Sequence, residues 1–151
     1  MKLSKGFSLI ELLTVVAIVG ILASVGIVSY NSYVWSTKKT SVKNIMQQMS
    51  LAQTEYISNT GSYFESSTPD TCEGEAGTAT KTQSTEINTR LLESETLDPD
   101  KLKFNLCVVD TSTDVPYISD YTIIAQATDG KKCKLQMHSN GSWKKDDGAD
   151  C

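Results

Sequence analysis

The sequence predicts an α+β protein in which one long N-terminal helix is laid on a small antiparallel sheet. Apolar residues fill positions 7–28 almost without interruption and then recur at spacings of three and four as far as residue 57. Short segments with apolar alternation, separated by glycine-containing turns, follow in the last third of the chain. A length of 151 residues fits a single domain.

The first element is predicted to be one helix from about residue 7 to about residue 57. Its first part, FSLIELLTVVAIVGILASVGIV, contains one ionisable residue, Glu11, and has about the 20 residues that a helix needs to cross a bilayer core. Beyond Tyr30 the apolar residues form a stripe, which consists of Val34, Val42, Ile45, Met46, Met49, Ala52, Tyr56 and Ile57. The stop signal is Asn59-Thr60-Gly61. The Met46 and Met49 side chains are expected in the core.

The stretch from residue 64 to residue 103 is rich in Ser, Thr and Glu and has few apolar residues. Ile87, Leu91 and Leu92 are spaced so that they would share one face of a helix. We therefore expect a long surface loop that contains one short amphipathic helix around these three residues.

Three strands are predicted next, at residues 104–109, 117–128 and 132–138. Asp129-Gly130 joins the second strand to the third, and Asn140-Gly141 ends the third. Both dipeptides are favoured where a turn requires positive φ. These turns predict an antiparallel sheet.

Composition excludes several classes of function. The formal net charge is −4 and the pI is about 4.9, whereas a generally basic nucleic-acid binder has a pI above about 9. The single histidine, His138, excludes a metal site built from two histidines of one chain, and no phosphate-binding glycine motif is present. We expect no enzyme activity, no cofactor and no metal site, and we interpret Asp146, Asp147 and Asp150 as a solvated acidic run rather than calcium ligands.

The four cysteines lie at wide spacings: Cys72, Cys107, Cys133 and Cys151. Zinc ribbons and redox motifs need closely spaced thiols. Two disulfides formed in an oxidising compartment outside the cytoplasm are therefore predicted. Four cysteines permit three pairings, among which their spacing does not decide.

The N-terminus is a targeting signal of an unusual kind. Lys2 and Lys5 precede Gly6, and the apolar run has no A-x-A-like cleavage site after it, so this run is expected to be retained with its positive end in the cytoplasm. Glu11 is costly there, because a central carboxylate in a spanning helix costs about 2.5 to 3.5 kcal/mol on insertion scales. Cleavage between Gly6 and Phe7 would create an α-amino group one helical turn from Glu11, and this amine would neutralise the Glu11 of the same or of a neighbouring chain.

Gly6 followed by Phe7-Ser8-Leu9-Ile10-Glu11-Leu12, at the head of a retained apolar helix, resembles the class III signal of type IV pilins and pseudopilins. The resemblance implies cleavage after Gly6 by prepilin peptidase and N-methylation of Phe7. It also implies packing of the helix into the core of a filament, in which Glu11 sets the register of the subunits.

The same resemblance implies three regions: a cytoplasmic leader of residues 1–6, a transmembrane or filament-core helix of residues 7–30, and a globular head of residues 31–151. The chain would be a single-pass protein of the bacterial inner membrane and then part of an extracellular pilus. Its partners would be other pilin subunits, the prepilin peptidase and the inner-membrane assembly platform. The implied pilin fold has a disulfide-tied C-terminal loop, and the implied pairs are Cys133 with Cys151 and Cys72 with Cys107.

The implied function is that of a pilus subunit serving adhesion, motility or DNA uptake. Helices of this family usually carry a proline where this chain has Val28, and Gly26 would then be the flexible point. This departure, together with two disulfides in a compact head, favours a minor pilin. A major pilin and a type II secretion pseudopilin are the alternatives.

Lysines flank the third predicted strand and surround Trp143: Lys131, Lys132, Lys134, Lys144 and Lys145. Lysines on an edge hairpin commonly protect it from aggregation. The alternative hypothesis is a DNA receptor for natural transformation, in which these lysines contact phosphates and Trp143 stacks or wedges against bases. Certain minor pilins of competent bacteria look similar, although Asp146, Asp147 and the net charge weigh against this hypothesis.

Overall fold

The computed structural model describes residues 6–67, 72, 78–111, 120–144 and 148–151. The chain divides into two units, one up to Thr37 and the other from Lys38 to Cys151. Some of the expectations lie outside the described residues: most of the leader, residues 117–119 of the second predicted strand, and Lys145, Asp146 and Asp147.

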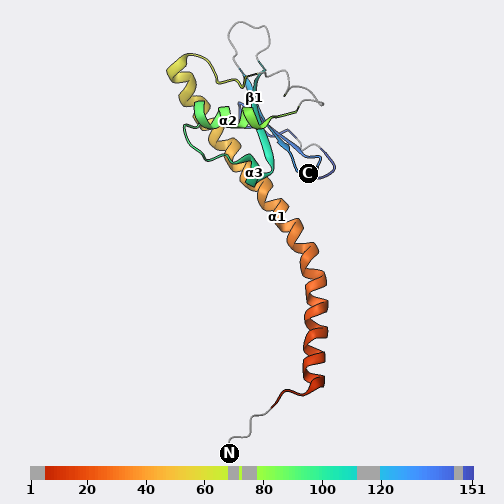
Figure 1. Cartoon of the computed structure of the whole chain (residues 1–151). Coiled ribbons are helices and arrows are strands. Elements are labelled where there is room, and N and C mark those ends of the chain that lie inside the picture. The colour runs from red at the N-terminus through yellow and green to blue at the C-terminus, as the bar shows by residue number, and fades with distance from the viewer. Residues whose placement is uncertain (1–5, 68–71, 73–77, 112–119, 145–147) are drawn as a thin grey trace, which may run out of the picture. The chain divides into compact units, whose positions relative to one another are not determined.

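A single helix, α1 (Leu9–Thr60), confirms the long N-terminal helix (Figure 1). It is continuous through Gly26 and Val28. Its end lies three residues beyond the expected one, where Gly61 adopts φ 85° and its amide donates to the carbonyl oxygen of Ile57 at 2.8 Å. Glycine suits this C-terminal cap because it tolerates the left-handed conformation.

Helix α2 (Lys81–Arg90) corrects the expected position of the short amphipathic helix. It begins six residues before Ile87, and Leu91 is already its C-cap. A capping box sets this start: the Thr80 side chain accepts from the Gln83 amide, and the Gln83 side chain accepts from the Thr80 amide. The T-x-x-Q capping pattern is visible in the sequence. The prediction rests on the spacing of apolar residues, which does not indicate where the helix begins.

A further short helix, α3 (Pro99–Leu102), was not expected from apolar spacing. The Asp98 side chain caps it by accepting from the amides of Asp100 and Lys101 at 3.0 and 3.1 Å. Pro99 opens the helix, where its missing amide hydrogen costs nothing. Local capping, rather than an apolar face, therefore creates α3.

The sheet confirms the antiparallel arrangement and, with α1, the α+β fold class. Its order is β1-β2-β3, with β1 (Phe104–Asp110), β2 (Tyr121–Ala127) and β3 (Lys134–His138). The third strand begins two residues later than expected. Cys133, directly before it, is held by its disulfide and accepts the Ala127 amide at 3.0 Å through its carbonyl oxygen.

One face of the sheet is turned toward α1. Tyr121, Ile123 and Ala125 alternate onto this face, and the Tyr121 hydroxyl lies 2.9 Å from the Ser50 hydroxyl of α1. The buried apolar side chains of α1 and of this face include Val42, Ile45, Met46, Met49, Leu106, Val108, Ile123, Ala125, Leu135 and Met137. Met46 and Met49, which are predicted to lie in the core, are both part of it.

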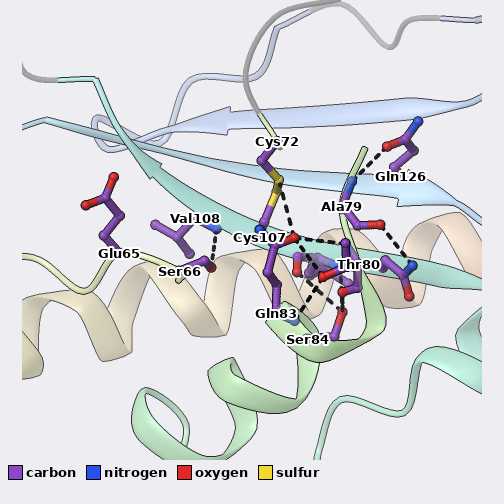
Figure 2. The surroundings of a disulfide bond; sticks show 12 residues. Glu65, Ser66, Cys72, Ala79, Thr80, Gln83, Ser84, Cys107, Val108 and Gln126 are labelled. Atoms are coloured by element: carbon purple, nitrogen blue, oxygen red, sulfur yellow. Dashed lines mark hydrogen bonds between the residues drawn. A yellow bond between two sulfur atoms is a disulfide. The ribbon is translucent and has the colours of Figure 1, made fainter. Parts of the chain in front are cut away.

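The opposite face of the sheet carries a second buried cluster around the disulfide between Cys72 and Cys107 (Figure 2). Ala79 lies against the same face, where its amide donates to Gln126 Oε1 and its carbonyl oxygen accepts from Asn105 Nδ2, both at 3.0 Å. The serine- and threonine-rich loop is therefore fastened to the sheet by one covalent bond and by side-chain amides.

Serine side chains cover the outer edge of β1. Ser84 Oγ accepts from the Leu106 amide at 2.8 Å and donates to the Leu106 carbonyl oxygen at 3.3 Å. The Ser66 amide donates to the Val108 carbonyl oxygen at 3.0 Å, and Ser66 Oγ accepts from the Val108 amide at 2.9 Å (Figure 2). An edge strand whose backbone groups are used in this way is protected from pairing with another strand.

Candidate functional site

The first turn of α1 joins Glu11 to Ser8. The Ser8 amide donates to Glu11 Oε2 at 2.9 Å, and the Glu11 amide donates to Ser8 Oγ at 3.3 Å. This reciprocal pair is a capping box, which satisfies two amides near the start of the helix that lack intrahelical partners. Ser8 was not among the expected site residues, although its S-x-x-E spacing to Glu11 signals this role.

The helix around Glu11 is covered with exposed apolar side chains. Its large apolar residues from Leu9 to Ile27 are 51% to 82% exposed. An 18-residue stretch of α1 has a mean hydropathy of 2.6, and none of this stretch is buried. By length and composition alone, the helix is suited to cross a membrane. Exposed apolar surface of this extent marks contact with a membrane or with other proteins.

All four cysteines are disulfide-bonded, in the pairing that the resemblance implies. Cys72 is joined to Cys107, and Cys133 is joined to Cys151 across 18 positions of the sequence. The second bond closes a C-terminal loop next to β3. Within this loop, Asp150 Oδ2 accepts from the Lys132 amide at 2.6 Å.

Two lysines of α1 contact this C-terminal loop. Lys39 Nζ donates to the Cys151 carbonyl oxygen at 2.6 Å. Lys43 Nζ lies 5.4 Å from the centroid of the Trp143 ring, within the range of a cation–π interaction. Their i,i+4 spacing puts both on one face of the helix. The sequence shows that spacing, but the partners lie about a hundred residues away.

The lysines of the expected patch differ from one another in exposure and in their contacts. Lys131 Nζ lies 3.8 Å from Asp150 Oδ1, while Lys132 and Lys144 are exposed. Lys134 corrects the expectation: it is 6% exposed, because it lies within β3 on the covered face of the sheet. Lys134 is therefore not available to contact a phosphate.

Trp143 is half-buried, and its backbone forms an isolated antiparallel β-bridge with Met137 of β3. With Lys43 over its ring, one position that a stacked base would take is already occupied. Among the residues that the structure describes, no group of three or more His, Cys, Asp or Glu side chains is arranged to hold a metal ion.

The chain is similar to one protein-family model and to pilins and fimbrial proteins of several bacteria. The family model for the prokaryotic N-terminal methylation motif matches residues 1–27. The type IV major pilin protein PilE1 of Neisseria gonorrhoeae is 41% identical over 66 residues, which are 44% of this chain and 40% of that protein. Fimbrial protein EcpC of Eikenella corrodens is 38% identical over 60 residues, 40% of this chain and 39% of that protein. A fimbrial protein of Pseudomonas aeruginosa is 46% identical over 54 residues, 36% of this chain and 33% of that protein.

The chain thus spans 40% or less of the length of these relatives. No solved structure matches it significantly. A long helix with an apolar first half, a three-stranded antiparallel sheet and a disulfide-closed C-terminal loop define the class of the protein, which has the pilin fold. Its methylation motif and its partial similarity to pilins and fimbrial proteins are the features that this chain shares with type IV pilins.

Proposed function

We propose that the protein is a structural subunit of a bacterial type IV pilus that assembles through its N-terminal helix. The observation that carries the proposal is the exposed apolar first half of α1, which has a single carboxylate, Glu11, in its first turn, four residues after Phe7. Cleavage after Gly6 would turn the Phe7 nitrogen into a cation, and N-methylation would keep that charge. Pairing this cation with Glu11 of the same or a neighbouring subunit offsets the cost of a carboxylate in an apolar environment.

The edges of the sheet support assembly through the helix rather than through the head. The outer edge of β1 is covered by the two buried serines described above. At the edge of β3, the His138 amide donates to the Ser142 carbonyl oxygen at 2.9 Å, and the Lys144 amide donates to the Gln136 carbonyl oxygen at 3.1 Å. Addition of a strand from another head is therefore disfavoured at both edges.

In this function the chain passes from the membrane to the filament in successive stages. Residues 1–6 are a cytoplasmic leader that prepilin peptidase removes, and residues 7–30 span the inner membrane before assembly. The assembly platform then moves the subunit into the filament, where residues 31–151 form the extracellular head. The apolar helices of neighbouring subunits take over the contacts that lipid made in the membrane.

Mass spectrometry of the mature protein and filament counts test the proposal together. We expect an N-methylated Phe7 at the N-terminus and loss of filaments in Glu11→Ala. Glu55→Ala, which removes an exposed carboxylate from the distant half of α1, is the matched control and should assemble normally. A different N-terminus, or normal filaments in Glu11→Ala, would contradict the proposal.

Within this function we favour a minor pilin, on the strength of a head closed by two disulfides and of Val28 at the usual place of a proline. The similarity to a major pilin supports the alternative. Counting subunits in sheared filaments separates the two: a minor pilin is present in few copies, and a major pilin forms the bulk. A secretion defect in a strain with intact pili would instead indicate a type II secretion pseudopilin.

A second candidate function is DNA binding by the head in natural transformation. It is favoured by the exposed Lys132 and Lys144. Lys43 of α1 adds a further cation beside Trp143, although it also covers one face of the ring that a base would stack on. The pairing of Lys131 with Asp150 reduces the available positive charge. Phosphate contacts by these lysines would make binding fall steeply with salt.

A gel shift with the full chain in detergent, at two salt concentrations, tests DNA binding. The double variant Lys132→Ala, Lys144→Ala should weaken a salt-sensitive shift. The double variant Lys81→Ala, Lys101→Ala removes two exposed lysines near α2 and α3 and should leave it unchanged. No shift at micromolar protein and low salt rejects the receptor function.

A further inference from the structure

A groove of about 400 Å³ lies on the face of the sheet that is turned away from α1. The strand register places its residues in two cross-strand rows, Val109 beside Thr122 and His138, and Ile124 beside Gln136. Because side chains alternate between the faces of a strand, all five point to the face opposite Tyr121 and Ile123. The groove is thus separate from the core that contains Tyr121 and Ile123.

The floor of the groove is apolar and its wall is polar. Val109 and Ile124 are 2% and 5% exposed and belong to the cluster around the disulfide between Cys72 and Cys107. On the wall, Thr122 Oγ1 lies 3.1 Å from His138 Nδ1. This hydrogen bond orients the imidazole and leaves Nε2 as its second hydrogen-bonding atom.

Lys144 gives the groove its charge. The hydrogen bond from the Lys144 amide to the Gln136 carbonyl oxygen, at 3.1 Å, holds this residue alongside β3 after the turn at Gly141. Its side chain lines the groove and is exposed. No carboxylate lines the groove among the residues that the structure describes. A cation beside neutral hydrogen-bonding groups and an apolar floor favours an anionic ligand over a neutral or cationic one.

We propose that this groove binds an acidic sugar, that is, a monosaccharide unit that carries a carboxylate or a phosphate group. Lys144 pairs with the anionic group, while Gln136 and His138, the latter oriented by Thr122, form hydrogen bonds with the ring hydroxyls. Val109 and Ile124, which are almost fully buried, close the floor of the groove beneath the ring. A volume of about 400 Å³ falls within the usual range of small-molecule sites, about 300 to 1,000 Å³. The site uses only residues of the head and goes beyond filament assembly.

The single histidine makes the test direct, because His138 gives the only imidazole signals of the chain. The full chain, labelled with ¹³C,¹⁵N-histidine and held in detergent micelles at constant pH and ionic strength, is titrated separately with four probes: glucuronate, glucose 6-phosphate, glucose and inorganic phosphate. We expect a saturable shift of the His138 signals with an acidic sugar, and the better of the two acidic sugars identifies the anionic group. Glucose and inorganic phosphate should bind much more weakly, because each lacks half of the contacts.

Variants separate the groove from general charge effects. Lys144→Gln should weaken acidic-sugar binding about tenfold or more, as expected for loss of a charge-assisted contact. Gln136→Leu, which removes the amide without altering charge, should weaken it as well. Lys101→Gln removes an exposed lysine on α3 and should bind normally. The proposal is overturned if neither acidic sugar gives a saturable shift, if glucose or inorganic phosphate binds as tightly, or if Lys144→Gln binds normally.

Discussion

The side-chain amide of Gln53 is paired with the backbone of Phe64 by two hydrogen bonds. Nε2 donates to the Phe64 carbonyl oxygen and Oε1 accepts from the Phe64 amide, both at 2.8 Å. Asn88 pairs with the backbone of Leu97 in the same way, at 2.6 and 3.1 Å. The side-chain amides of Gln53 and Asn88 thus hydrogen-bond the backbone of the passing segments, as a neighbouring strand would do in a sheet. This arrangement explains how a segment with few apolar residues is held in place.

The Gln53 pair predicts a large effect from one polar residue. Gln53→Leu leaves the buried amide and carbonyl groups of Phe64 without partners, and each such group costs about 1 to 3 kcal/mol. We expect a corresponding loss in the free energy of unfolding, measured by denaturant titration. Gln48→Leu, at an exposed position of the same helix, is the control and should change stability little. Equal stability of the two variants would contradict the prediction.

The protected edge of β1 depends on Ser84. Ser84→Ala removes both hydrogen bonds to Leu106, and at a residue that is 0% exposed no water replaces them. We expect a loss of about 1 to 3 kcal/mol in the free energy of unfolding, together with faster hydrogen exchange of the Leu106 amide. Ser58→Ala, on the exposed surface of α1, provides the comparison. Unchanged exchange at Leu106 would show that this edge is protected by other means.

The Glu86 carboxylate predicts a pH dependence of stability. Burial raises the pKa of Glu86, but hydrogen bonds from Ser67 and Arg90 outweigh burial and hold this pKa below the ordinary value of 4.5. Because the pKa is lower in the folded state than in the unfolded state, the stabilisation is fully present above about pH 4.5 and is lost as the pH falls through the folded-state pKa. In thermal unfolding from pH 6 down to about pH 3, Glu86→Gln should therefore lose less stability than the wild type. Parallel pH profiles would refute this assignment.

The two disulfides should differ in their accessibility to reductant. Cys72 and Cys107 are 0% exposed, whereas Cys151 is partly exposed beside a surface loop. Stepwise reduction followed by alkylation and mass spectrometry should modify Cys133 and Cys151 first. Simultaneous modification of all four cysteines would mean that opening of one disulfide unfolds the head.

Removal of the bond between Cys133 and Cys151 should mainly release the C-terminal loop. A bridge that spans 18 positions is worth about 3 kcal/mol in the chain-entropy model. In Cys133→Ser, Cys151→Ser we expect rapid hydrogen exchange in residues 142–151 and retained protection in residues 42–53 of α1, because the core does not contain the loop. Lys39→Ala removes only the contact to the Cys151 carbonyl oxygen and should loosen the loop less. Loss of protection throughout α1 would contradict this separation.

The sequence by itself determined the elements that rest on local patterns. Apolar periodicity gave the long helix, alternation gave the three strands, and Asp129-Gly130 and Gly141 marked turns that require positive φ. The S-x-x-E and T-x-x-Q capping patterns at Ser8 and Thr80 were equally local, and attention to them would have located both helix starts. Such features depend only on residues a few positions apart, so one sequence is enough to reveal them.

Only the tertiary structure decided the contacts between distant segments. Lys134 is a lysine beside a turn, and its burial follows from the register that pairs it with Gln126 across the sheet. The contact between Lys39 and Cys151, and the cross-strand rows that form the groove at His138, likewise depend on how the strands align and on where the chain returns. Local propensity carries no information about these choices, because they are fixed by the packing of the whole sheet against α1 and by the closure of the two disulfides.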